Sequence, residues 1–280
     1  MSKSIEIKDI KSYTENMSKG IDDKLFFLNK IKFRPDEEYL FVDFGCADGT
    51  MISAMYEIFE AHSLHAKFIG YDISEEMIRF AKSKFNFDTG KVLFTTDWED
   101  VEIRMGLRPN KKKEKKTILI LSSVIHEVLC YANCSQDIRD FWDRVLKSGF
   151  DYVCVRDMML TLDADRKSDE DTEKAIRDNL AVGSRLKDFE ERWGSIAKNE
   201  NLIHFLLKYK WKINWDRELN ENYLPKHLEY LMNQFKDEYN VTYLERFRVP
   251  YLEECWKNDF GIELTDYTHV KLIFEQKKLV

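Results

Sequence analysis

The sequence contains little that would place the protein in a membrane or outside the cell. No apolar run approaches the about 20 residues that a membrane-spanning helix needs. The first residues, MSKSIEIKDIKSYTEN, include no apolar segment typical of a secretory signal. Cysteines are few, scattered and odd in number, which predicts reduced thiols rather than a disulfide framework; they lie at positions 46, 130, 134, 154 and 255. We therefore expect a cytoplasmic protein.

Ligand spacings for a metal ion are also missing. Cys130 and Cys134 form a C-x-x-x-C pair, but no second pair lies nearby. His62 and His65 follow a predicted surface helix and lack a carboxylate partner in register. We therefore expect no metal site. The net charge of −7 provides no overall attraction to nucleic acid, although it leaves room for local basic patches.

What the chain does have is the composition of a folded globular protein. Its 280 residues suffice for one large domain or for a domain with a sizeable insertion. Hydrophobic residues make up 44% of the sequence, which argues against wholesale disorder. We find no internal repeat and no low-complexity linker.

Apolar runs alternate with helical patterns through the first half of the chain. Because the runs are continuously apolar, they are typical of strands covered on both faces, and the β-α-β-α series predicts a parallel, doubly wound sheet. The predicted strands span 39–44, 66–72, 91–96, 117–123 and 150–158, and the predicted helices span 50–62, 74–84, 98–105 and 135–147.

The alternation stops after residue 158. Residues 159–237 show several helical patterns and no clear strand, and two β-like runs at 239–249 and 268–277 then predict an antiparallel pair. We therefore predict an α/β fold with a doubly wound, seven-stranded, mostly parallel sheet and an inserted helical subdomain. The main domain would comprise residues 1–158 and 238–280, with 1–38 as an N-terminal helical cap and 159–237 as the insertion.

A glycine turn follows the first predicted strand, in the stretch DFGCADG at 43–49. Gly45 would start a tight turn, and Gly49 would let the backbone pass close to a neighbour before the next helix begins. The N-terminus of that helix suits a carboxylate or phosphate. The spacing does not match G-x-G-x-x-G, which argues against a nicotinamide dinucleotide.

The stretch instead resembles motif I of the class I S-adenosylmethionine (SAM)-dependent methyltransferases, whose usual pattern is acid-x-G-x-G-x-G. Ala47 stands here in place of the middle glycine. The late antiparallel pair is also similar to this family, in which strand seven lies between strands five and six. The resemblance covers roughly residues 20–158 and 239–277 and does not include the insertion. It implies a Rossmann-like fold, SAM as cofactor and S-adenosylhomocysteine (SAH) as product.

The resemblance also implies roles for residues at the strand ends. Asp72 would bind both ribose hydroxyls, and Asp97, beside Trp98, would meet the adenine amino group. An isolated acid at such a place is more often a helix N-cap, but three acids in register with a glycine turn favour the cofactor site. The full implied set is Asp43, Gly45, Cys46, Ala47, Gly49, Asp72, Ile73, Met77, Asp97, Trp98 and Ser122.

Catalytic candidates follow the fourth predicted strand. Methyl transfer is an in-line displacement that requires an aligned nucleophile and, for hydroxyl or amine acceptors, removal of a proton. His126 and Glu127 resemble the His-acid pair of those family members that act as O-methyltransferases, with the histidine as general base. The alternative is that His126 only packs under the cofactor. The N-P-P-[YF] motif of enzymes that methylate base amino groups is absent after this strand.

Candidate substrate residues lie mainly in the predicted insertion. The segment 204–227 interleaves aromatic and basic residues, which would suit a lid over a planar or anionic acceptor. The alternative is that the rings form the core of a small helical subdomain and the lysines face solvent. The residues selected are Tyr13, Arg156, Lys208, Tyr209 and Trp215.

Three functional hypotheses remain at this point. The first is a methyltransferase that acts on an oxygen or nitrogen atom of a small molecule. The second is an RNA or other nucleic-acid methyltransferase that uses the Lys/aromatic insertion, which steep salt sensitivity would reveal. The third is a non-catalytic module that keeps the cofactor fold. The sequence indicates no membrane partner and leaves protein partners open.

Overall fold

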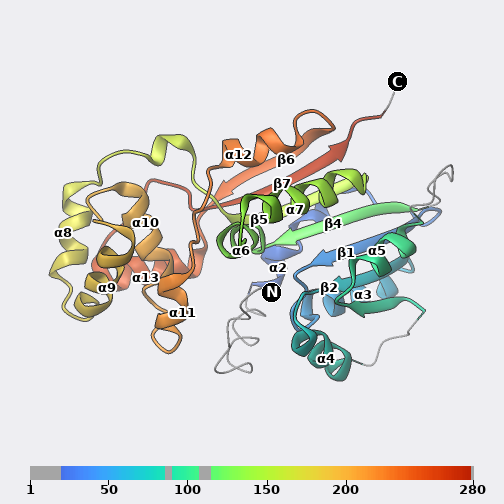
Figure 1. Ribbon diagram of the computed structural model, residues 1–280, viewed down its shortest axis with the longest axis horizontal. Helices are drawn as coiled ribbons and strands as arrows, with labels where there is room; N and C mark the ends of the chain where they lie inside the picture. The colour runs from blue at the N-terminus through green and yellow to red at the C-terminus, as the bar shows by residue number, and fades with distance from the viewer. Residues whose placement is uncertain (1–19, 86–89, 107–114, 279–280) are drawn as a thin grey trace.

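The computed structural model describes residues 20–85, 90–106 and 115–278, and a seven-stranded sheet runs through them (Figure 1). The strand order is β3-β2-β1-β4-β5-β7-β6. Strands β1 to β5 pair in parallel, and β7 pairs antiparallel with both β5 and β6. This order confirms the predicted doubly wound sheet with its seventh strand between the fifth and the sixth. The strands are β1 (Glu38–Phe44), β2 (His65–Tyr71), β3 (Val92–Thr95), β4 (Lys116–Ser122), β5 (Tyr152–Met158), β6 (Tyr239–Phe247) and β7 (His269–Gln276).

Helices connect the strands near the positions expected from the sequence. Two helices, α6 and α13, were not predicted. The seven residues of α6 are too few to show a helical period, and α13 lies in the segment that was predicted only to join the last two strands. The helical elements are α2 (Ile21–Lys24), η1 (Phe26–Asn29), α3 (Thr50–Ala61), α4 (Glu75–Lys84), α5 (Trp98–Met105), α6 (Ile125–Tyr131), α7 (Ser135–Lys147), η2 (Leu162–Ala164), α8 (Glu170–Asp178), α9 (Gly183–Trp193), α10 (Asn199–Lys208), α11 (Trp215–Asn220), α12 (Leu228–Phe235) and α13 (Pro250–Phe260). Among the described residues, no helix has the length and apolar character needed to cross a membrane.

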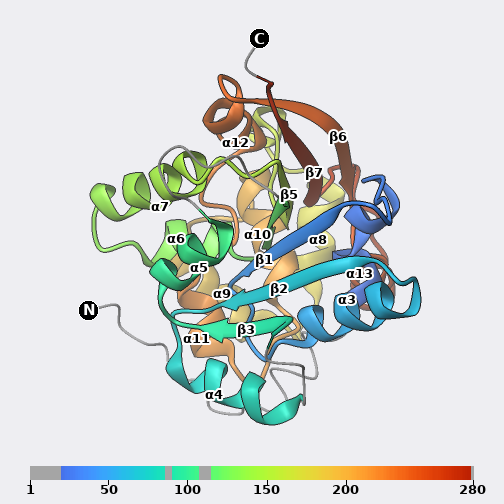
Figure 2. The ribbon, with the colours of Figure 1, turned by 90° about the vertical axis from the view of Figure 1, so that its right-hand side faces the viewer.

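Both faces of the central strands are buried, which explains the continuous apolar runs. In β1, Phe41 belongs to a core with Ile52 and Phe59 of α3, whereas Val42 belongs to a core with Val145 of α7 on the other face. Figure 2 shows α3 on one side of β1 and β2, with α5 and α7 on the other. The alternate side chains of a central strand are therefore apolar in both directions.

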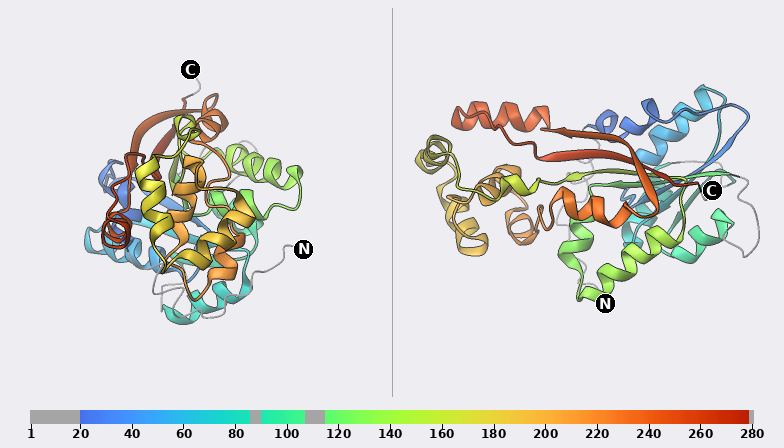
Figure 3. Two further views of the ribbon diagram at one scale, coloured as in Figure 1. Left: turned by 90° about the vertical axis from the view of Figure 1, so that its left-hand side faces the viewer. Right: turned by 90° about the horizontal axis from the view of Figure 1, so that it is seen from above.

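A third core belongs to a helical subdomain beyond the carboxyl ends of the parallel strands (Figures 1 and 3). Helices α8 to α11 surround Phe189 and Phe205, and Trp256 of α13 packs into the same core. By contrast, Phe235 of α12 packs against the sheet. This packing differs from the predicted insertion at 159–237, because the chain returns to the sheet before β6 and leaves it again before β7. We propose a subdomain made of α8 to α11 and α13.

Candidate functional site

The glycine turn joins β1 to α3 at the carboxyl edge of the sheet. Gly45 and Gly49 have φ angles of 77° and 75°, in the left-handed region that disfavours residues with a Cβ atom. A Cβ at Gly45 would lie 2.8 Å from Cγ2 of Val124, and one at Gly49 would lie 2.7 Å from Cζ of Phe94. Both glycines are therefore required by backbone conformation and by the packing of the surrounding core.

The turn is fastened to the end of β2. The amides of Gly45 and Cys46 donate to the carbonyl of Tyr71 over 2.8 and 3.0 Å. The amide of Ala47 donates to Oδ2 of Asp72 over 2.9 Å. Ala47 has a φ of 45°, so the residue that replaces the usual middle glycine holds a strained conformation. The side chain of Cys46 is buried in the core.

Asp72 holds the position predicted for it, at the carboxyl end of β2. Its Oδ1 accepts from the amide of Ser74 over 2.9 Å, and Ser74 itself caps α4 through the amide of Met77. Asp72 is therefore not the helix cap that the alternative interpretation required. Burial raises the pKa of Asp72, against two backbone hydrogen bonds that lower it. Beside it, Ile73 is 71% exposed, whereas Met77 is buried in α4.

Asp97 and Trp98 lie just after β3, and their contact with adenine stays a prediction. Asp97 is exposed and caps α5 by accepting from the amide of Glu99 over 2.9 Å. The Trp98 ring is buried in the core. Its centroid lies 5.2 Å from the centroid of the Tyr71 ring and 5.7 Å from that of the Phe44 ring. Asp97 thus acts as a helix cap and Trp98 as a core side chain. Helix α5 begins at Trp98 itself, which turns the indole toward the sheet.

A pocket opens between the glycine turn, the end of β4 and α2. Ser122 contributes a buried Oγ that has no hydrogen-bond partner among the described residues. Asp43 is 2% exposed, and burial raises its pKa to about 7 although the nearby Lys24 opposes this shift. The lining comprises Ile21, Lys24, Asp43, Gly45, Cys46, Asp48, Thr50, Met51 and Ser122.

Asp48 was missed by the sequence analysis, although the second acid of DFGCADG was a visible signal. Its carboxylate is buried, pairs with Nζ of Lys84 over 2.5 Å and accepts from the amide of Thr50 over 3.1 Å. Asp48 therefore holds the first turn of α3 in place against α4.

Ion pairs hold α2 over the pocket. Asp23 lies 3.0 Å from the Arg156 guanidinium on β5 and 2.5 Å from the Lys271 ammonium on β7. Arg156 also donates to Oγ of Ser123 over 3.0 Å. Arg156, predicted to bind substrate, is thus engaged in placing the helix above the pocket. Tyr13, another predicted substrate residue, lies outside the described residues.

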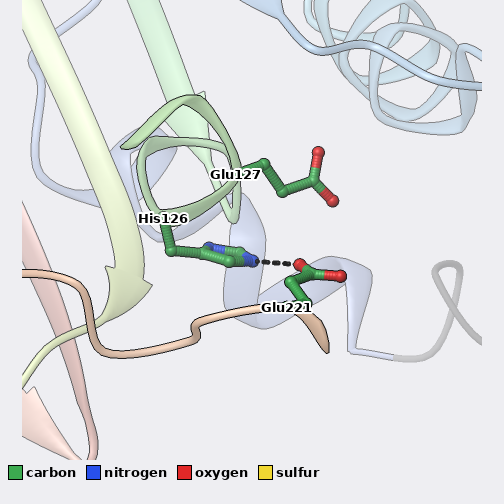
Figure 4. Close-up of side chains that lie close together, drawn as sticks. All are labelled: His126, Glu127 and Glu221. Atoms are coloured by element: carbon green, nitrogen blue, oxygen red, sulfur yellow. Dashed lines mark hydrogen bonds and ion pairs between the residues drawn. The ribbon is translucent and has the colours of Figure 1, made fainter. Parts of the chain in front are cut away.

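The first catalytic candidate, His126, lies between two carboxylates at the start of α6. Its Nδ1 lies 2.7 Å from Oδ1 of Asp157, at the end of β5, and its Nε2 lies 3.1 Å from Oε1 of Glu221 (Figure 4). Burial alone would lower the pKa of His126, but the Asp157 charge and both hydrogen bonds raise it well above its usual value. Neither ring nitrogen is free to accept a substrate proton, so this geometry does not support the predicted general-base role.

The second candidate, Glu127, is the more accessible member of the same group. Its side chain is 35% exposed, and its carboxylate lies near that of Glu221 in Figure 4. Burial and the Glu221 charge raise the pKa of Glu127 to about 7. Arg217 approaches both carboxylates, at 3.6 Å from Glu127 and 3.4 Å from Glu221.

Three members of this group escaped the sequence analysis: Asp157, Arg217 and Glu221. Asp157 ends a predicted strand, which is a signal of the kind already used for Asp72. Glu221 is 95 positions from His126 in the chain, and no local pattern connects the two.

The insertion residues selected as substrate contacts lie within the helical subdomain. Lys208 is fully buried and donates to the carbonyls of Glu218 and Glu221 over 2.8 and 2.6 Å. The Tyr209 hydroxyl donates to Asp259 over 2.7 Å, and Nε1 of Trp215 donates to Asp188 over 3.1 Å. The alternative of a subdomain core is thus favoured for Lys208 and Tyr209, whose side chains face no open surface.

No protein-family model and no curated protein sequence matches this chain. Its structure is similar to that of a SAM-dependent methyltransferase from Archaeoglobus fulgidus, at 13% identity and a TM-score of 0.48, over 95% of this chain and 98% of the other. A SAM-dependent methyltransferase from Mesorhizobium loti matches at 12% identity and a TM-score of 0.49, over 92% and 100% of the two chains. For a putative SAM-dependent methyltransferase from Listeria monocytogenes the identity is 14%, the TM-score 0.45 and the coverage 92% and 99%. The likeness concerns the overall fold, and the site is therefore interpreted from its own residues.

Proposed function

We propose that this protein is a SAM-dependent methyltransferase that transfers a methyl group to an oxygen or nitrogen atom of a small molecule and releases SAH. The observation that carries the proposal is the joining of the glycine turn to the Asp72 carboxylate by the Ala47 amide, next to the pocket at the carboxyl edge of the sheet. Ligands of open α/β sheets bind at this edge. The buried Oγ of Ser122 in the pocket wall has no hydrogen-bond partner among the described residues, which supports a polar ligand in the pocket.

The ribose, the adenine ring and the cationic groups of the cofactor each have a chemically suitable partner. Asp72 provides a carboxylate for the two ribose hydroxyls, and the exposed Ile73 beside it provides an apolar surface for the adenine ring. Asp43, buried in the pocket, carries the charge that would balance the ammonium and sulfonium groups. When bound, SAM supplies an activated methyl group, so the protein has to align the acceptor and exclude water.

The acceptor would approach beside α6, between the sheet and the helical subdomain. Glu127 and Glu221 form a polar wall there, and Glu127 is the group with access to an incoming molecule. Lys208 and Tyr209, part of the Lys/aromatic insertion on which the nucleic-acid hypothesis depends, are buried in the subdomain core. That burial supports a small acceptor over RNA.

The test is incubation of the protein with methyl-labelled SAM and a cell extract, followed by separation of small molecules, RNA, DNA and protein. We expect label in the small-molecule fraction, and a Glu127→Gln variant should reduce it strongly. Label in RNA or DNA would contradict the proposed acceptor class. Failure of the protein to bind SAM or SAH at all would favour the non-catalytic module instead.

A further inference from the structure

The side chains of His126, Glu127 and Glu221 converge on one point between the sheet and the helical subdomain (Figure 4). Each offers one ligand atom, and the three atoms lie within 4.8 Å of one another. Two of these residues are adjacent on α6, and the third arrives from the segment after α11. The set combines an imidazole nitrogen with carboxylate oxygens from separate parts of the fold.

Asp157 orients the imidazole as metal sites commonly require. Its Oδ1 lies 2.7 Å from Nδ1 of His126, so the Nδ1 proton can point to this carboxylate and Nε2 faces Glu221. An ion bound at Nε2 would displace the proton that this nitrogen otherwise shares with Glu221, and the proton would leave to solvent. Asp157 also accepts from the amide of Ile125 over 2.8 Å and is fully buried. A carboxylate that fixes the far nitrogen of a histidine is the usual support of a histidine ligand.

Arg217 lies beside both glutamates and pairs with an oxygen of Glu221 other than the one that faces His126. Its guanidinium lies 3.4 Å from Oε2 of Glu221, while Oε1 of Glu221 faces His126. It lies 3.6 Å from Oε1 of Glu127, which leaves the other oxygen of Glu127 for a ligand bond. The distance of 3.1 Å between Nε2 of His126 and Oε1 of Glu221 matches two adjacent ligands, each about 2.1 Å from a common ion.

We propose that His126, Glu127 and Glu221 bind one divalent transition-metal ion. One imidazole and two carboxylates suit Mn²⁺, Fe²⁺ or Zn²⁺ better than Ca²⁺, which takes oxygen ligands. With three protein ligands, the remaining positions are open to water or to an oxygen atom of an acceptor. This inference departs from the expectation of no metal site, because the ligands come together only in the fold.

The test is a titration of the chelator-treated, full-length protein with Mn²⁺, followed by electron paramagnetic resonance without SAM or acceptor. We expect one bound ion per chain, with spin-echo modulation from a directly bound nitrogen. Glu127→Gln and Glu221→Gln should each weaken binding about tenfold or more, and Asp157→Asn should weaken it about 10–100-fold. Glu218→Gln is the matched control, because this neighbouring buried carboxylate is not among the three ligands; it should bind Mn²⁺ as the unmodified protein does.

Absence of Mn²⁺ binding by the folded, unmodified protein at millimolar concentration would overturn the proposal. Binding that Glu127→Gln, a change at a partly exposed side chain, leaves unaltered would overturn it as well. Because the measurement needs neither SAM nor turnover, its result is separate from that of the methyltransferase test.

Discussion

At the scale of single residues, Gly45 shows why the turn after β1 has its particular sequence. Gly45 has a φ of 77°, and a Cβ atom added to it would lie 2.8 Å from Cγ2 of Val124. Gly106 has a similar φ of 70°, but no atom of the described part of the chain lies within 4 Å of that site. Substitution of these two glycines by alanine therefore distinguishes the cost of the strained backbone, present at both positions, from the cost of steric overlap, present at Gly45 alone.

We predict that Gly45→Ala lowers the free energy of unfolding by roughly 2–3 kcal/mol and weakens SAM binding. Gly106→Ala should cost roughly 1 kcal/mol, because it introduces strain alone, and should leave SAM affinity unchanged. Urea unfolding and calorimetric titration measure both quantities. Equal effects of the two substitutions would show that contact with Val124 is unimportant.

Asp43 provides a prediction about pH. Its pKa of about 7 in the free protein means that the carboxyl is largely protonated below neutral pH. A cationic cofactor favours the ionised form, so SAM binding should release a proton, and SAM affinity should rise with pH until Asp43 is fully ionised. Each unit of pH below the pKa should cost up to about 1.4 kcal/mol of binding free energy.

Asp43→Asn removes the titrating group and is the comparison that isolates this effect. Its SAM affinity should be weaker at high pH and should change less between about pH 6 and pH 8. Calorimetry in two buffers of different ionisation enthalpy counts the protons released. Identical pH profiles for both proteins would rule out Asp43 as the linked group.

At the scale of structural elements, Lys208 joins α10 to the segment that carries Glu221. Its ammonium donates to the carbonyls of Glu218 and Glu221 and lies 4.6 Å from the centre of the Tyr223 ring. Lys208 therefore positions Glu221, whose carboxylate lies beside Glu127, from within the subdomain.

We predict that Lys208→Met lowers the free energy of unfolding by about 3 kcal/mol, because two carbonyl groups lose their donor. Hydrogen exchange in residues 215–223 should accelerate at the same time. Lys210→Met is the matched control: Lys210 is two positions away and pairs with Asp259 at a partly exposed site. A small, equal effect of both changes would contradict the positioning role of Lys208.

Helices and strands were predictable from the sequence where neighbouring residues alone determine them. The strands near 39–44 and 117–123 were located from sequence because each is buried on both faces and reads as a continuous apolar run. Helix α6 was not predicted from the sequence because it is short. The packing of α12 against the sheet was not predicted because it depends on tertiary contacts. The position of Asp72 at the end of β2 was predicted from the strand, whereas the burial of the Trp98 ring was not, because only the packing of α5 decides where that ring points.

At the scale of the whole molecule, the two proposed sites lie along one edge of the sheet. The pocket beside the glycine turn is lined by residues of α2, β1, α3 and β4, and the His126 group joins β5 and α6 to the helical subdomain. The second site could not be deduced from sequence, since Glu221 is 95 positions from His126 in the chain and reaches it only through the packing of the subdomain against the sheet. The proposed cofactor site is by contrast largely local, because the glycine turn and Asp72 each directly follow a strand that the sequence predicts.

The measurement that tests the central claim most directly is a calorimetric titration of the protein with SAH. We predict one site per chain. Asp72→Asn should weaken binding by about 1.5–3 kcal/mol, because a charge-assisted hydrogen bond to the ribose is lost. Asp97→Asn, which alters an exposed helix cap, should change affinity much less. If the folded protein binds neither SAH nor SAM, or if Asp72→Asn binds as tightly as the unmodified chain, the assignment of this pocket to SAM is wrong.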